Sequence, residues 1–148
     1  MTRIIKYGSA YVLWIVDLAL ALWLAYLCKD GLITILALFY KEGNFAYLNA
    51  SNFADKVFTI MLGLSLLIFM IIIEAYFRVG VLKDDLLKRF ATVTGPVLLC
   101  IFIVDLILFW MQGVSARAWL RWLILAAELG IGMALLVSAK TRFTSKFN

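Results

Sequence analysis

Four long, almost uninterrupted apolar stretches constrain this sequence more than any other feature. A helix that crosses the hydrocarbon core of a bilayer needs about 20 mostly apolar residues. Hydrophobic residues make up 66% of the 148-residue chain, against roughly half in a soluble domain. The sequence therefore predicts an all-α integral membrane protein, in which residues 1–148 form a single membrane domain. Its four spanning helices form a bundle and cover, to within a few residues, 7–28, 57–77, 92–111 and 119–139.

Two shorter apolar patterns lie between these spans. Leu32–Tyr40 is too short to cross a bilayer, so we expect a short interfacial segment after the first span or an outward extension of the first helix. After the second span, Leu82, Leu86 and Phe90 fall at helical spacing with charged residues between them. This second pattern predicts a short amphipathic helix lying on lipid, with binding of a cytosolic partner as the alternative.

The distribution of lysine and arginine predicts the orientation, because positive charge near the ends of spans is retained in the cytoplasm. Nine such residues lie in the tails and in the loop after the second span, and five lie in the other two loops. Both termini are therefore expected in the cytoplasm, and the compact loops fit a bacterial inner membrane. The nine are Arg3, Lys6, Arg78, Lys83, Lys88, Arg89, Lys140, Arg142 and Lys146; the five are Lys29, Lys41, Lys56, Arg117 and Arg121.

Each predicted span contains one carboxylate: Asp17, Glu74, Asp105 or Glu128. An ionised side chain near the bilayer centre costs about 2.5–3.5 kcal/mol on insertion scales, so such groups normally face protein or water. Glu74 lies roughly 5 Å from the end of its span, and Arg78 follows one helical turn later. These two residues are predicted to form an interfacial ion pair.

Asp17, Asp105 and Glu128 fall deeper, where no lysine or arginine lies at a comparable depth. Arg121 precedes Glu128 by two helical turns, which corresponds to about 10 Å toward the non-cytoplasmic surface. The long arginine side chain narrows this gap without obviously closing it. The carboxyls must therefore be protonated, hydrogen-bonded, or paired with a cation from a substrate or a partner subunit. We regard all three as candidates for an ion path or a partner contact.

Small residues recur at every fourth position of the last span. A stripe of this kind lets two membrane helices approach closely, within one chain or between copies. Glu128 points about 200° away from the start of the stripe, so the fourth helix would have two buried faces. We therefore expect this helix either at the centre of the bundle or against another protein. The predicted helix-packing stripe consists of Ala126, Gly130, Ala134 and Ser138.

The composition offers little for catalysis or cofactor binding. The chain has no histidine and only two cysteines, so no metal site and no cofactor are expected. No nucleophile with its base, Walker loop or dinucleotide fingerprint is present, which argues against an enzyme. The net charge of +5 is spread along the span ends rather than in a long basic run, which favours membrane lipids over nucleic acid as partners.

Three functions fit these patterns. The first is a non-catalytic subunit of a larger membrane protein complex, with a structural, assembly or stabilising role and with other membrane subunits or copies of itself as partners. The second is a small proton- or cation-coupled transporter or channel component that uses the intramembrane carboxylates. The third is a lipid-binding membrane protein.

Overall fold

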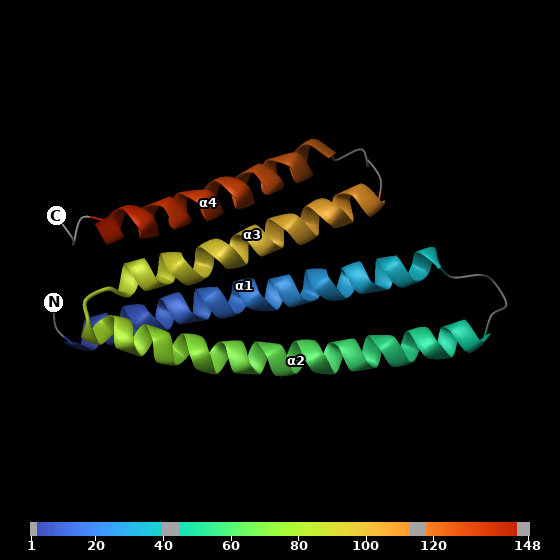
Figure 1. The fold of residues 1–148 in the computed structure, drawn as a ribbon, viewed down its shortest axis with the longest axis horizontal. Helices are drawn as coiled ribbons and strands as arrows, with labels where there is room; N and C mark the ends of the chain where they lie inside the picture. The colour runs from blue at the N-terminus through green and yellow to red at the C-terminus, as the bar shows by residue number, and fades with distance from the viewer. Residues whose placement is uncertain (1–2, 40–44, 113–117, 145–148) are drawn as a thin grey trace.

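The computed structural model describes residues 3–39, 45–112 and 118–144, and four helices make up almost all of them. Each helix is long and apolar enough to cross a membrane, which confirms the prediction of an all-helical chain with four helices of spanning length. The helices run alternately in opposite directions, so the start of the first and the end of the last lie at the same end of the molecule (Figure 1). They are α1 (Arg3–Leu38), α2 (Phe45–Leu82), α3 (Leu86–Gln112) and α4 (Ala118–Thr144).

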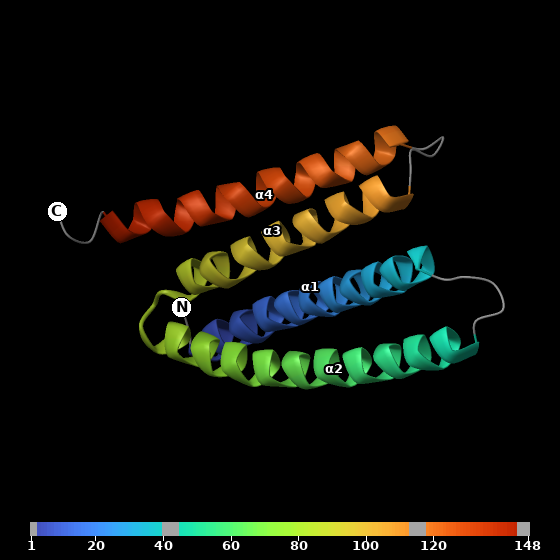
Figure 2. The same cartoon turned by 45° about the vertical axis from the view of Figure 1, so that its right-hand side comes forward.

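The four helices do not form a square bundle. Helix α1 packs against α2 and α3, and α2 also meets α3, whereas α4 packs on α3 alone among the described helices (Figures 1 and 2). The last helix was expected either at the centre of the bundle or against another protein. The prediction of a central position is thus wrong. We call the end with the start of α1 and the end of α4 the terminal end, and the opposite one the far end.

Helices α1 and α2 are longer than the apolar stretches predicted. They have 36 and 38 residues, about 54 and 57 Å at 1.5 Å per residue, against a hydrocarbon core of about 30 Å. Helices α3 and α4 have 27 residues each, about 40 Å. The α1–α2 pair therefore extends past α3 at the far end (Figure 1).

The apolar segment after the first predicted span continues α1 to Leu38 and does not form a separate interfacial segment. Within this extension, the Thr34 hydroxyl donates a hydrogen bond to the Asp30 carbonyl one turn earlier, at 2.9 Å. From α2, the Tyr47 hydroxyl donates to the Leu36 carbonyl. Contacts within α1 and with α2 thus hold this segment in the helix. The structure therefore agrees with the second expectation for this segment, an outward extension of the first helix.

A tight connection, Lys83–Asp85, joins α2 to α3. Asp84 has a positive φ of 55°, a conformation that aspartate adopts more readily than most residues. The Asp85 carbonyl accepts a hydrogen bond from the Arg89 N–H at 3.1 Å and so begins α3. The amphipathic helix predicted here is therefore wrong, because residues 80–90 are divided between the end of α2 and the start of α3.

The buried core is centred on α3, and its largest fully buried apolar side chains are those of Phe77, Ile101, Leu108 and Leu125. Most of the outer surface is apolar as well. Residues such as Ile60, Leu64, Ile68 and Ile71 of α2 are more than half exposed. A bilayer accepts such a surface and water does not, which supports an integral membrane protein.

Candidate functional site

The first polar cluster lies between α1 and α3, where the side chain of Asp17 is fully buried. The Thr94 hydroxyl, itself buried, donates a hydrogen bond of 2.6 Å to Asp17 Oδ1. Asp17 Oδ2 has no hydrogen-bond partner among the described residues. The neighbours of Asp17 on its helical face, Ala10 and Ala21, are buried too, which lets α3 approach α1 closely.

The second cluster lies between α3 and α4 and contains the other two deep carboxyls. Arg121 Nη2 of α4 lies 3.8 Å from Asp105 Oδ1 of α3, and its guanidinium lies 6.0 Å from the centre of the Phe109 ring. Asp105 is almost fully buried, and Glu128 Oε2 is buried without a hydrogen-bond partner among the described residues. Arg121 therefore brings a cation to Asp105 across the helix interface.

These two clusters do not form one continuous chain of carboxyl groups. Thr94 and Asp105 are eleven residues apart on α3, which corresponds to about 16 Å along the helix axis. No hydrogen bond or ion pair found among the described residues links Asp17 to the Asp105 cluster. The structure thus brings together Asp105 and Arg121 but keeps Asp17 apart with Thr94.

At the terminal end, charged side chains tie the helices together. The Arg78 guanidinium lies 2.7 Å from the Glu74 carboxylate on α2 and donates a longer hydrogen bond, 3.4 Å, to the Tyr11 hydroxyl of α1. Lys6 of α1 forms an ion pair with Asp84 in the α2–α3 connection. The hydrogen bond and positive charge of this lysine lower the pKa of the Asp84 carboxyl.

The small-residue stripe of α4 lies on the exposed surface of the helix, although Ser138 at its end also lines a pocket with residues of α3. All four of its members, Ala126, Gly130, Ala134 and Ser138, are exposed. A Cβ atom built on Gly130 would have no other atom within 4 Å, so nothing in the described chain packs closely there. Within this chain, the stripe is not the surface that joins α4 to α3.

The close contact between α3 and α4 instead involves two other glycines. A Cβ atom on Gly132 would lie 3.2 Å from Leu99 Cδ2, and one on Gly95 would lie 2.9 Å from Leu136 Cγ. Sequence reasoning did not single out these glycines for packing. It also did not propose Thr94 or Arg121 as the partners of Asp17 and Asp105, although a hydroxyl or a cation at matching depth on another span would have been a usable signal.

No cluster of three or more histidine, cysteine, aspartate or glutamate side chains suited to a metal ion occurs in the described ranges. Both cysteines, Cys28 and Cys100, are free thiols. No protein-family model, curated protein or solved structure matches the chain.

Proposed function

We propose that this chain is a non-catalytic subunit of a membrane protein complex and that it contacts a neighbouring membrane helix through the outward face of α4. The observation that carries this proposal is the exposure of the small-residue stripe Ala126, Gly130, Ala134 and Ser138. Small side chains at four-residue spacing let two helices pack backbone to backbone in lipid. The neighbour is another membrane subunit or a second copy of the chain.

The attachment of α4 supports this role. Because α4 packs on α3 alone among the helices that the structure describes, most of its circumference is available to another transmembrane helix. Asp105 already has Arg121 as its cation, so a partner need not supply one there. The lysine and arginine distribution supports cytoplasmic termini, and the compact loops support a bacterial inner membrane.

The test uses two exposed glycines, Gly130 on α4 and Gly63 on α2, at which an added Cβ atom would have no neighbouring atom within 4 Å in the described chain. Each is replaced by leucine, and the protein is purified from gently solubilised native membranes, with its partners identified and counted by mass spectrometry. We expect Gly130→Leu to lower recovery of the partner or second copy at least tenfold while the amount of the chain stays unchanged. Gly63→Leu is the control and should retain the complex. Recovery of the unmodified chain as a lone monomer would overturn the proposal.

A second candidate function is a proton or cation path through Asp17. It is favoured by one observation, a fully buried carboxyl whose Oδ2 has no hydrogen-bond partner among the described residues. The separation along α3 argues against a single path that also includes Asp105 and Glu128. If Asp17 carries ions, Asp17→Asn abolishes proton or cation flux into liposomes containing the purified protein and leaves its abundance unchanged. Equal flux from both proteins would exclude this candidate.

A further inference from the structure

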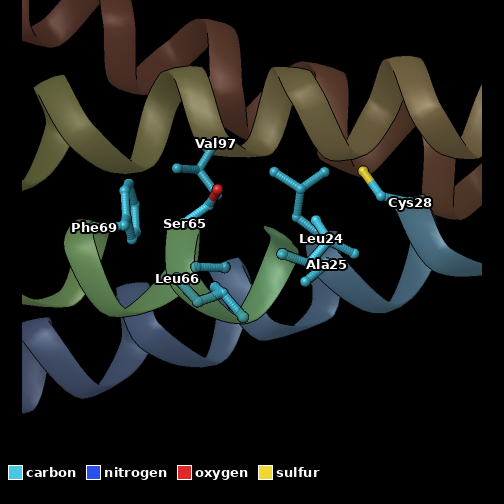
Figure 3. Close-up of a pocket in the computed structure, with 9 residues that line it drawn as sticks. Leu24, Ala25, Cys28, Ser65, Leu66, Phe69 and Val97 are labelled. Carbon is cyan, nitrogen blue, oxygen red and sulfur yellow. The ribbon is translucent and has the colours of Figure 1, made fainter. Parts of the chain in front are cut away.

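An apolar groove of about 210 Å³ lies between α1, α2 and α3. It forms because α2 and α3 meet at their short connection and diverge toward the far end, with α1 between them (Figures 1 and 2). Ala21 and Ala25 of α1 contribute small side chains, and Leu66 and Phe69 of α2 and Val97 of α3 line the rest. Figure 3 shows Phe69 at one end of this groove and Cys28 at the other.

We propose that this groove binds an acyl chain of a membrane phospholipid. Its lining belongs to segments long and apolar enough to span the membrane, and only the Ser65 hydroxyl and the Cys28 thiol interrupt its apolar side chains. A water molecule needs two to four polar partners and would find too few here. Hydrocarbon from the bilayer is the medium that can fill such a space without leaving a void.

The shape of the groove favours a linear ligand. On α1 its lining extends from Ala21 to Cys28 and on α2 from Leu62 to Phe69, each about 10 Å along the helix axis. The groove therefore follows the helices, as an acyl chain in a bilayer does.

The charges next to the groove indicate which lipid class it takes. Lys29 directly follows Cys28, and its ammonium lies 3.6 Å from the Asp55 carboxylate, beyond normal hydrogen-bond distance. Both side chains are about one-third exposed. Lys29 thus keeps hydrogen-bond donors for a phosphate, which places the headgroup near the far end and the acyl chain along the groove toward Phe69. This site does not involve α4 and is independent of the function proposed above.

The first test measures the retention of phosphatidylglycerol by the purified full-length chain with native mass spectrometry. Ala25→Phe fills the groove, and Ala19→Phe places the same side chain at an exposed position of the same helix. We expect the unmodified chain and Ala19→Phe to retain one lipid, and Ala25→Phe to retain at least tenfold less. Equal retention by all three proteins would show surface lipid only and overturn the proposal.

A second measurement uses the unmodified chain and so does not depend on how Ala25→Phe folds. A phosphatidylglycerol with a diazirine in its acyl chain is photolysed on the protein, and the adducts are mapped by mass spectrometry. Adducts should concentrate on residues 21–28 and 62–69. An even spread over the exposed faces of α2 and α4, or crosslinks from this groove to another protein chain, would contradict the site.

The phosphate preference is tested with the double variant Lys29→Gln/Asp55→Asn, which removes both charges and leaves no unpaired one. Phosphatidylglycerol and diacylglycerol, which lacks the phosphate, compete for the unmodified chain and for the variant. The unmodified chain should prefer the phospholipid at least fivefold, and the variant should bind both equally. The same preference in both proteins would remove Lys29 from the site.

Discussion

The carboxyls of Asp17 and Asp105 are both buried at helix interfaces, but they have different kinds of partner. Asp105 faces a guanidinium from α4, whereas the one hydrogen bond to the Asp17 carboxyl from the described part of the chain comes from the Thr94 hydroxyl. Removing one partner of a buried hydrogen bond leaves the other with its full desolvation cost, about 1–3 kcal/mol. The contact with Thr94 therefore stabilises the packing of α1 on α3.

The variant Thr94→Val keeps the side-chain shape and removes this hydrogen bond. We expect it to lower the free energy of unfolding in detergent by about 1–3 kcal/mol, whereas Thr94→Ser, which keeps the hydroxyl, should lose less than half as much. Thr92→Val is the matched control, since the Thr92 hydroxyl is exposed and its hydrogen bond goes to the Lys88 carbonyl of its own helix. A Thr94→Val variant as stable as the unmodified chain would mean that the Asp17 contact contributes nothing.

The sequence predicted which carboxyls are buried but not which groups satisfy them. A carboxyl in a long apolar stretch is recognisable from hydropathy alone, so Asp17 and Asp105 were identifiable. The contact of Arg121 with Asp105 depends on the register between α3 and α4, which no residue pattern along either helix specifies. The depth of a residue along its own helix therefore underestimated how far its long side chain reaches onto the neighbouring helix.

At the scale of helices, two local features determine how the elements meet. One is the Lys83–Asp85 connection, with Asp84 held by Lys6 of α1. The other is the Gly95 and Gly132 contact, which brings α3 and α4 close together. The first is electrostatic and exposed, and the second is steric and buried.

The Lys6–Asp84 pair predicts a specific dependence on pH. The pKa of Asp84 in the folded chain is lowered by Lys6 from its ordinary value of about 3.8. The stabilisation is therefore fully present above about pH 4 and is lost as the pH falls through the lowered folded pKa. Lys6→Gln should raise the pKa of Asp84 in a carboxyl NMR titration, whereas Lys83→Gln removes a neighbouring charge and should change it less. Equal titration curves for Lys6→Gln and the unmodified chain would show that the ion pair does not form in solution.

The glycine contact predicts opposite outcomes at two neighbouring positions of α4. Gly132→Leu must displace Leu99 from its position and should destabilise the α3–α4 pair by about 1–3 kcal/mol, as overpacking does. At the exposed Gly130 an added Cβ atom has no neighbouring atom within 4 Å in the described chain, so Gly130→Leu should lower the unfolding free energy of the isolated chain by no more than about 0.5 kcal/mol. Unfolding in detergent, followed by energy transfer between labels on α3 and α4, measures both. Equal destabilisation by the two variants would contradict this packing.

At the scale of the whole molecule, the number of helices follows from hydropathy but their arrangement does not. In a soluble protein the apolar face of a helix marks the side that is buried. Here nearly every face is apolar, as on α2, so the pattern does not indicate which face meets another helix. The peripheral place of α4 and the outward direction of its small-residue stripe were for this reason not predictable.

The lengths of α1 and α2 lead to a prediction for the molecule in its membrane. Both helices exceed the hydrocarbon core by about 25 Å, and the polar residues near the start of α2 lie on the part that extends past α3. If both termini lie in the cytoplasm, as proposed above, this far end emerges on the opposite side. In a background of Cys28→Ala and Cys100→Ala, Asn52→Cys should therefore react with a membrane-impermeant maleimide on intact cells.

Lys83→Cys, in the α2–α3 connection at the terminal end, provides the matched control for this labelling. It should react only after the cells are permeabilised, because the lysine and arginine distribution predicts that this end lies in the cytoplasm. The reverse labelling pattern would mean that the orientation is opposite to the predicted one, without changing the number of spans. Protection of Asn52→Cys in intact and permeabilised cells alike would instead mean that the α1–α2 extension is covered. The cover would be a locally thickened bilayer, a bilayer in which the two helices tilt, or a partner subunit. Because Asn52 is exposed in the isolated chain, such protection would also give a position from which to crosslink whatever covers it.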